Sequence, residues 1–451
     1  MFASLPEFHE WFAGRSRVHR YRVERVPLAA LDQWYRAPET GNLGHRSGKF
    51  YTVEGLRVRT DHREVGEWSQ PIIVQPEIGI LGILVKRFQG VPHCLMQAKM
   101  EPGNVNLIQV SPTVQATRSN YTRVHHGAAV PYLEHFRAPR RGRVIFDALQ
   151  SEQGSWFLNK RNRNLIVEVD EDVEPHEDYC WLTVAQLRSL LTEPNLVNMD
   201  SRTVLSGMPF LSKAQRAGAT GYGRMPARER DAGALHTTEQ ALSWFCEAKS
   251  AYQLDRRRIA LDDVKNWLNA DDEIAHERGL YFSVIGVDVQ ASNREVSHWS
   301  QPMLAPRGRG VVAFLGRWLG DVFHVLVQAR TEAGTADVVE MSPTVNCAPE
   351  NYRLLPRERW PRYLDAVLSA RPSSLLVDVV HSEEGGRFFH AENRYVVVDV
   401  GDSVPLRVPD DYLWMSVPQL TGFVRYGSHV SVGARSLLTC LERRIEQRVA
   451  G

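Results

Sequence analysis

A row of polar side chains lies on the strand predicted near residues 93–101. Gln97, Lys99 and Glu101 alternate there with Ala98 and Met100, and side chains two apart on a strand share a face. An amide, an ammonium and a carboxylate therefore stand side by side, and these groups suit the binding of a polar small molecule. A solvent-exposed face of an antiparallel sheet would show the same alternation, which leaves a structural interpretation open.

The polar row occurs a second time as Gln328, Arg330 and Glu332. The pairing of residue 97 with residue 328 sets an offset of 231, which holds without a gap across more than a hundred residues. It relates Trp68-Ser-Gln-Pro to Trp299-Ser-Gln-Pro, Asn120-Tyr121 to Asn351-Tyr352, Ser151-Glu152 to Ser382-Glu383, and Asn162-Arg163 to Asn393-Arg394. The chain is therefore a duplication, with predicted domains over residues 1–206 and 235–451 and a linker over 207–234.

Each half carries the same polar residues near predicted strand ends and turns, where they can converge on a pocket. A repeated structural hydrogen-bonding network is the alternative. The candidates are Trp68, Gln70, Gln97, Lys99, Glu101, Asn104, Ser111, Thr113, Asn120, Tyr121, Glu152 and Arg163 in the first half, and Trp299, Gln328, Arg330, Glu332, Ser342, Thr344, Asn351 and Tyr352 in the second.

Helices are predicted at both ends of a mostly extended middle in each half. Apolar spacing predicts helices over residues 6–14 and 27–34, with the Trp-Ser-Gln-Pro motif in a turn. Closing helices begin near Thr183 and Ser416, and Thr237 with Gln240 forms a capping-box pattern. Strands follow near residues 50–58, 79–86, 93–101 and 105–110. This order predicts an α+β fold with a mixed sheet between helices.

Composition argues against several classes of protein. The net charge of +1 gives no electrostatic footprint for nucleic acid or an anionic membrane. The five cysteines show no Cys-x-x-Cys spacing, which favours a reducing, cytoplasmic compartment. No apolar run approaches a transmembrane length. The motifs for metal, dinucleotide and ATP sites are missing, so no cofactor is expected.

The repeated motifs resemble those of the NDP-hexose 2,3-dehydratases over essentially the whole chain. The resemblance rests on Trp-Ser-Gln-Pro, Gln97-Ala-Lys-Met-Glu-Pro-Gly-Asn, the segment from Ser111 to Tyr121, and Ser-Glu-(Gln/Glu)-Gly. It implies two tandem Nudix-like domains, a homodimer, a dTDP-4-keto-6-deoxyglucose substrate and two nucleotide-sugar pockets per subunit. It also implies an NADPH-dependent 3-ketoreductase as the next enzyme in 2,6-dideoxysugar biosynthesis.

One departure from the Nudix hydrolases concerns their magnesium-binding helix. Neither half contains Gly-x5-Glu-x7-Arg-Glu-x-x-Glu-Glu-x-Gly, so the carboxylates that would activate water on a pyrophosphate are missing. Hydrolysis is therefore disfavoured and nucleotide-sugar binding is retained. A pyrophosphatase with a rebuilt metal site and a non-catalytic nucleotide-sugar binding protein remain alternatives.

The resemblance also implies roles for the residues. Elimination across C2–C3 of a 4-keto sugar needs a base at C3, a donor to the enolate and an acid for the C2 hydroxyl. We assign Glu101 as the base, Lys99 as the enolate stabiliser and Tyr121 as a donor to the departing hydroxyl, with Glu152 as an alternative base. The first half is preferred because lysine exchanges protons more readily than Arg330. Further expectations are that Arg118 or Arg123 contacts the pyrophosphate, and that Trp68 or Tyr121 lies against thymine or sugar.

Overall fold

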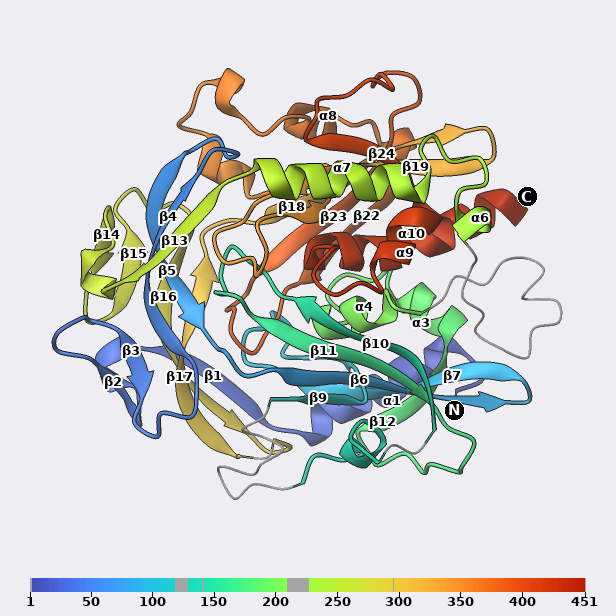
Figure 1. Cartoon of the computed structure of the whole chain (residues 1–451). Helices are drawn as coiled ribbons and strands as arrows, with labels where there is room; N and C mark the ends of the chain where they lie inside the picture. The colour runs from blue at the N-terminus through green and yellow to red at the C-terminus, as the bar shows by residue number, and fades with distance from the viewer. Residues whose placement is uncertain (1, 118–128, 140–141, 209–226, 295, 451) are drawn as a thin grey trace.

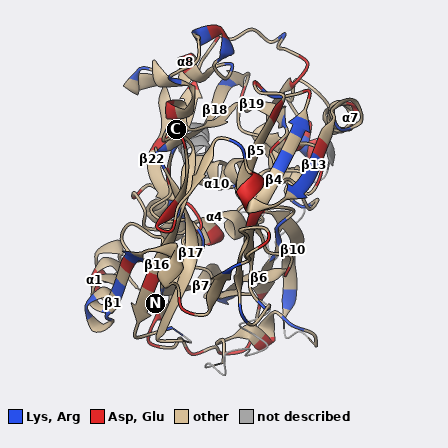
Figure 2. Cartoon of the chain, turned by 90° about the vertical axis from the view of Figure 1, so that its left-hand side faces the viewer, with Lys and Arg blue, Asp and Glu red and all other residues tan. Residues whose placement is uncertain are grey.

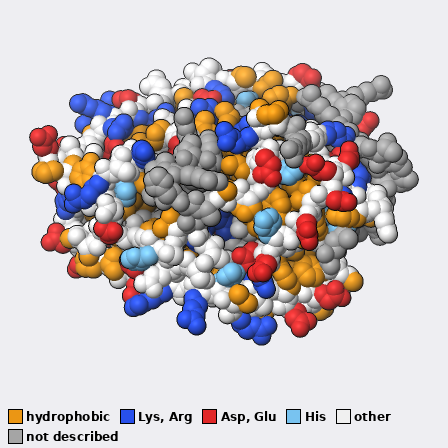
Figure 3. All heavy atoms as spheres, turned by 90° about the horizontal axis from the view of Figure 1, so that it is seen from below, with side chains coloured by type: hydrophobic (Ala, Val, Ile, Leu, Met, Phe, Trp, Pro, Cys, Tyr) orange, Lys and Arg blue, Asp and Glu red, His pale blue; other side chains and the backbone are white. Residues whose placement is uncertain are grey.

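The computed structural model describes residues 2–117, 129–139, 142–208, 227–294 and 296–450. It confirms two repeated α+β halves, in which two five-stranded and two seven-stranded sheets carry most of the chain (Figure 1). Seen from below, acidic and basic side chains are interspersed over the described surface (Figure 3). Among the described residues, no helix is long and apolar enough to span a membrane.

The first seven-stranded sheet runs β10-β11-β6-β7-β12, with β8 beside β7 and β9 beside β6. Strand β6 is parallel to β11, and the neighbouring pairs are antiparallel. The second half repeats the order as β22-β23-β18-β19-β24, with β20 and β21. The strands are β6 (Gly79–Phe88), β7 (Val91–Met100), β8 (Ile108–Ser111), β9 (Val114–Ala116), β10 (Arg143–Ser151), β11 (Arg161–Glu168), β12 (Tyr179–Thr183), β18 (Gly310–Leu319), β19 (Val322–Arg330), β20 (Glu340–Ser342), β21 (Val345–Cys347), β22 (Leu375–Ser382), β23 (Glu392–Asp399) and β24 (Tyr412–Ser416).

The five-stranded sheets exchange one strand between the halves. Strand β1 (Tyr21–Val26) pairs with β16 (Phe282–Ala291) of the second half, and β13 (Leu254–Ile259) pairs with β4 (Thr52–Thr60) of the first. The basic residues of β13 lie beside β4 (Figure 2). The remaining strands are β2 (Trp34–Arg36), β3 (Leu43–His45) and β5 (Glu67–Val74), and β14 (Trp267–Asn269), β15 (Glu273–His276) and β17 (His298–Pro306). Each half therefore completes a sheet of the other.

Helices α1 (Leu5–Val18) and α7 (Thr238–Ala251) open the two halves. The predicted capping box of Thr237 and Gln240 is confirmed at α7. The closing helices α3 (Val184–Leu190) and α9 (Val417–Phe423) are confirmed too, and their N-caps Thr183 and Ser416 each form a capping box. Shorter helical segments are α6 (Ala227–Arg230), α8 (Leu364–Leu368), and 3-10 turns at Leu28–Ala30, Leu133–His135, Leu261–Asp263, Pro349–Tyr352, Arg357–Arg359 and Pro372–Ser374.

Two helices meet at the centre of the molecule, α4 (Met199–Leu205) and α10 (Val432–Ala450). Each carries a fully buried arginine that reaches into the other half. Arg202 donates to the Ser382 carbonyl at 2.8 Å, and Arg435 donates to the Ser151 carbonyl at 2.7 Å. Because hydrogen bonds from charged donors are the stronger kind, the helix of each half fixes the Ser-Glu turn of the other.

Two predicted elements differ from the structure. The Trp-Ser-Gln-Pro motifs lie inside strands β5 and β17 instead of turns. Among the strands of its sheet β5 is paired with β4, and an edge strand of this kind tolerates Pro71. The predicted helix over residues 27–34 is a 3-10 turn that ends at Ala30, after which Trp34 begins β2. Trp34 instead packs from its strand into a hydrophobic core with Tyr51.

Candidate active site

The polar row at the end of β7 and of β19 faces the Ser-Glu turn of the other half. A Cβ atom built on Gly385 would lie 2.9 Å from the Cβ of Glu101, and one on Gly154 would lie 3.1 Å from the Cβ of Glu332. We name the two places the Lys99 site (Lys99 and Glu101 with the turn at Gly385) and the Arg330 site (Arg330 and Glu332 with the turn at Gly154). Both sites are composites of the two halves.

Strand β5 and the first-half turn at Gly154 both lie at the Arg330 site. Ile73 forms a parallel bridge with Phe157, so the strand that carries Trp68 and Gln70 is fixed beside the segment that follows Gly154. Leu304 and Phe388 form the matching bridge for β17 and the second-half turn. Trp68 and Gln70, candidates of the first half in the sequence, therefore lie with second-half residues such as Arg330 and Glu332.

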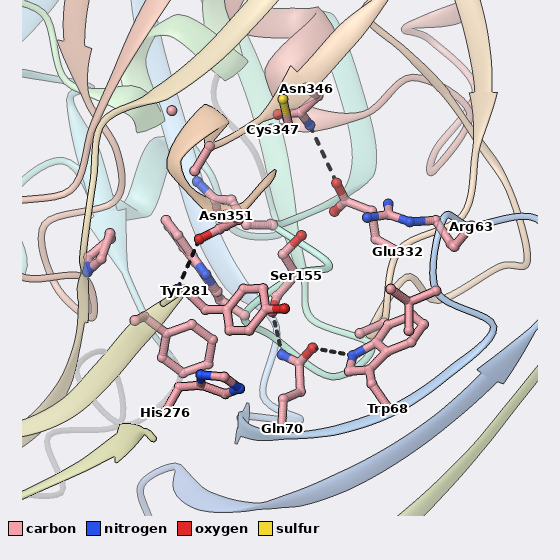
Figure 4. Close-up of a pocket in the computed structure, with 18 of the residues that line it drawn as sticks. Arg63, Trp68, Gln70, Ser155, His276, Tyr281, Glu332, Asn346, Cys347 and Asn351 are labelled. Carbon is pink, nitrogen blue, oxygen red and sulfur yellow. Dashed lines mark hydrogen bonds between the residues drawn. The ribbon is translucent and has the colours of Figure 1, made fainter. Parts of the chain in front are cut away.

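The Arg330 site contains a cavity of about 1000 Å³. Trp68 donates to Gln70 at 2.8 Å, and Gln70 donates to the Ser155 carbonyl at 2.8 Å (Figure 4). Opposite them, Asn346 reaches Glu332 at 3.4 Å. The lining also includes Glu152, Arg330, Glu340, Asn351 and Tyr352. A cavity of this size and mixed polarity suits a ligand as large as a nucleotide sugar.

Burial raises the pKa of two groups at the Arg330 site. The pKa of Glu340 rises to about 7, and the pKa of the Tyr352 phenol rises to about 12. A phenol with such a pKa stays protonated near neutral pH and offers a hydrogen to a ligand.

In the Lys99 site, amides position the Glu101 carboxylate. Glu101 is 3% exposed and accepts from Gln115 at 2.6 Å, with longer contacts to Asn198 at 3.4 Å and Asn104 at 3.5 Å. The ammonium of Lys99 donates to the backbone carbonyl of Gln115 at 3.0 Å. Gln115 thus links the cation to the carboxylate and holds both at one end of β7.

Two further carboxylates, Asp200 and Glu384, lie close to Glu101 at the Lys99 site, and Glu152 of the Arg330 cavity interacts electrostatically with both. Burial, and next the carboxylates of Glu101, Glu152 and Glu384, raise the pKa of Asp200 well above its usual range. Burial and then Glu101 raise the pKa of Glu384 to about 7, and burial raises the pKa of Glu152. Such shifts concentrate at functional sites. Sequence reasoning missed Asp200 because α4 was not predicted, and passed over Glu384 as the variable position of the Ser-Glu-(Gln/Glu)-Gly motif.

The second-half strand β17 completes the Lys99 site. Trp299 donates to Gln301 at 3.0 Å, and Gln301 donates to the Gly386 carbonyl at 2.6 Å. Arg294 donates to the Met100 carbonyl at 2.9 Å. Trp299, grouped from the sequence with the second pocket, therefore lies beside the first-half strand.

Several predicted site residues hold the fold together. Thr113 bridges two strands by accepting from the Leu84 amide and donating to the Leu95 carbonyl, and Thr344 does the same in the second half. Arg163 forms a surface ion pair with Asp147.

Ser111 accepts from Asn198 at 2.9 Å, Ser342 lies 3.2 Å from Ser431, and Gln328 donates to Asp411 at 3.2 Å. Gln97 is partly buried on β7. Arg118, Asn120, Tyr121 and Arg123 lie outside the described residues.

Within the described ranges, no group of three or more His, Cys, Asp or Glu side chains is placed to hold a metal ion.

The loops that join the halves leave no space for a side chain at Gly103. A Cβ there would lie 1.8 Å from the Phe388 carbonyl oxygen, and the Gly103 amide donates to the Gly385 carbonyl at 2.7 Å. We expect Gly103→Ala to lower turnover and to destabilise the fold by about 1–3 kcal/mol or more. Thermal unfolding and steady-state kinetics measure both effects.

Gly14 in α1 provides the control, because a Cβ there meets no atom within 4 Å. Gly14→Ala is expected to be neutral or to stabilise the helix by up to ~1 kcal/mol. If Gly103→Ala behaved like Gly14→Ala, the close contact between the two halves would be wrong.

Comparison with known proteins gives matches over both halves. A sequence model of the family described as NDP-hexose 2,3-dehydratase matches residues 5–208 and again residues 238–441. A relative from Streptomyces violaceoruber is 55% identical over 437 residues, which cover 96% of each chain. Relatives from Saccharopolyspora spinosa and Amycolatopsis orientalis are 48% and 47% identical, over 96% and 98% of this chain and 90% and 91% of their own. All three are named dTDP-4-dehydro-6-deoxy-alpha-D-glucopyranose 2,3-dehydratase.

Proposed function

Since this chain belongs to the NDP-hexose 2,3-dehydratase family, as its motifs indicated, we propose that it removes water from dTDP-4-keto-6-deoxyglucose. The product is the dTDP-3,4-diketo-2,6-dideoxyhexose of deoxysugar and antibiotic biosynthesis, and the enzyme is a carbon–oxygen lyase. The observation that carries the proposal is the buried pairing of Lys99 and Glu101 through Gln115 at one end of β7, in a chain 55% identical to a named dehydratase.

Glu101 takes the C3 proton in this proposal. The hydrogen at C3 is acidic because its carbanion delocalises onto the C4 oxygen, so a positioned carboxylate suffices as base. Lys99 lies two residues before Glu101, near the end of β7, and stabilises the enolate. Tyr121 and Glu152 stay candidates for a donor to the C2 oxygen and an alternative base.

The Arg330 site is proposed as the second nucleotide-sugar pocket. Its cavity retains the aromatic Trp68, the amide of Gln70 and the cation of Arg330, which suit base, sugar and phosphate. Arg330 is 7% exposed and its guanidinium remains charged at any working pH. The chemistry is assigned to the Lys99 site for that reason.

The finer features of the family resemblance are part of the same proposal. We place each half in the Nudix-like class, the active species as a homodimer, and the protein in the cytoplasm, where its five free cysteines stay reduced. The labile diketo product calls for an NADPH-dependent 3-ketoreductase as the next step.

A mass-spectrometric assay tests the function. The purified protein is incubated with dTDP-4-keto-6-deoxyglucose, the ketoreductase and NADPH, and the expected product has lost one water and gained two hydrogens. Release of a nucleoside monophosphate would identify a pyrophosphatase instead. Bound but chemically unchanged dTDP-sugar would identify a binding protein.

Chelation is expected to leave water loss unchanged. The steps above are assigned to side chains, and neither half contains the carboxylate-rich magnesium helix of the Nudix hydrolases. The measurement is the initial rate of dehydration with and without EDTA. Loss of activity in EDTA with recovery in magnesium would contradict the assigned mechanism.

A further inference from the structure

We propose that Glu384, in place of Tyr121, is the acid that protonates the departing C2 hydroxyl at the Lys99 site. The inference rests on the proposed function and adds a catalytic residue from the second half of the chain. It follows from where the second-half turn places this side chain, from what surrounds it, and from what replaces it at the Arg330 site.

The turn places Glu384 close to Glu101. The Gly386 amide donates to Glu384 Oε1 at 3.0 Å, which fixes the carboxyl group against its own turn. A Cβ built on Gly386 would lie 3.8 Å from Glu101 Oε1 and 2.4 Å from Glu384 Oε1. The proposed base and the proposed acid therefore approach the same glycine from two halves of the chain.

The second oxygen of Glu384 is available for a ligand. Glu384 Oε2 is buried and has no hydrogen-bond partner among the described residues, and the same holds for Oδ1 of Asp200, which is 3% exposed. Buried carboxyl oxygens rarely stay without a partner. A substrate hydroxyl that accepts a proton from Oε2 would satisfy this atom.

The surrounding charges favour a protonated Glu384. Three carboxylates (Glu101, Glu152 and Asp200) interact electrostatically with Glu384, against two cations, Arg387 and Lys160. The Gly386 amide and the Tyr51 phenol are its other neighbours. Burial and then Glu101 raise the pKa of Glu384 to about 7, where a general acid works best near neutral pH.

The Arg330 site has no carboxyl group at the positions that match Glu384 and Asp200. Gln153 occupies the position that matches Glu384, and its amide donates to Glu383 at 2.7 Å. In the closing segments the offset is 233, as for Arg202 and Arg435, so Gly433 occupies the position that matches Asp200. Carboxylates at these two positions thus occur only at the site that also has Lys99, while the glutamate that follows the strand (Glu101 or Glu332) is present at both sites.

In the proposed elimination, Glu101 takes the proton from C3. The electrons of that C–H bond first form the enolate and then the C2–C3 double bond. The C2–O bond breaks with its electrons on oxygen, which takes the proton of Glu384 and leaves as water. The enol transfers its hydroxyl proton to solvent, gains a proton at C2 and becomes the 3-ketone.

A fluoride leaving group separates the acid from the base. Fluoride departs as an anion without a proton, so the 2-deoxy-2-fluoro analogue of the substrate needs Glu101 but not Glu384. Glu384→Gln is expected to lower water loss at least ~10²-fold and to release fluoride at close to the wild-type rate. Glu101→Gln is expected to lose both reactions. Glu358 is exposed, and the control variant Glu358→Gln is expected to retain both.

The pH profile of the wild-type enzyme tests the same claim without a variant. Water loss should fall as the pH rises through about 7, because Glu384 loses the proton it must donate, whereas fluoride loss should not fall there. Equal loss of both reactions in Glu384→Gln, or a shared alkaline limb, would overturn the assignment. A wild-type enzyme that eliminates neither leaving group would overturn the proposed function instead.

Discussion

Replacing Glu101 by glutamine is expected to lower turnover at least ~10²-fold, the smallest loss typical of a general base. The amide keeps the size of the side chain and removes its capacity to take the C3 proton. The Gln115 amide that now donates at 2.6 Å can still meet the carbonyl oxygen of the new side chain. We therefore expect the variant to fold, to bind dTDP-sugar and to fail at proton abstraction.

Glu332→Gln is the matched change at the Arg330 site. Glu332 follows the end of β19 as Glu101 follows the end of β7, and it contacts Asn346 at 3.4 Å as Glu101 contacts Gln115. If the Lys99 site performs the chemistry, turnover in Glu332→Gln stays near wild type in the ketoreductase-coupled assay. The reverse pattern would move the active site to the Arg330 site.

Arg435→Met is expected to cost about 3–5 kcal/mol in the free energy of unfolding, as when one partner of a buried charged network is removed. Arg435 is fully buried and donates to Thr203 at 2.7 Å, to the Ser151 carbonyl at 2.7 Å and to the Val430 carbonyl at 2.5 Å. It also faces the carboxylates of Glu152 and Glu340. Methionine fills part of the volume and satisfies none of these groups.

Arg394→Met is the control for the loss of an arginine. Arg394 pairs with Asp378 at 2.7 Å on the surface, with both side chains about one third exposed, and exposed ion pairs contribute about 0–1 kcal/mol. Urea denaturation of both variants gives the comparison. Equal stability of Arg435→Met and Arg394→Met would mean that Arg435 does not join the halves.

Local signals made part of the fold predictable. The constant offset revealed the duplication, alternation located the strand that carries the polar row, and the sequence placed the closing helices near Thr183 and Ser416, where the structure has their N-caps. The polar row of Gln97, Lys99 and Glu101 pointed to a site because its spacing is a property of one strand. These features depend on residues close together in the sequence.

Local sequence signals do not predict the strand exchange between the halves. Strand β1 carries alternating charges and pairs with residues some 260 positions downstream, a partner that its own pattern does not specify. The same interlocking of the two halves places Trp68 at the Arg330 site and Glu384 close to Glu101. Helix α4 was missed because its buried face includes Asp200, Ser201, Arg202 and Thr203, which do not form an apolar stripe.

The fate of labelled atoms in the substrate tests the central claim most directly. dTDP-4-keto-6-deoxyglucose is prepared with a heavy oxygen at C2 and deuterium at C3, and the quenched, ketoreductase-trapped product is weighed by mass spectrometry. Elimination across C2–C3 predicts loss of both labels, whereas a heavy oxygen placed at C3 is retained. A product that keeps the C2 oxygen, or a sugar phosphate released from the nucleotide, would contradict the account.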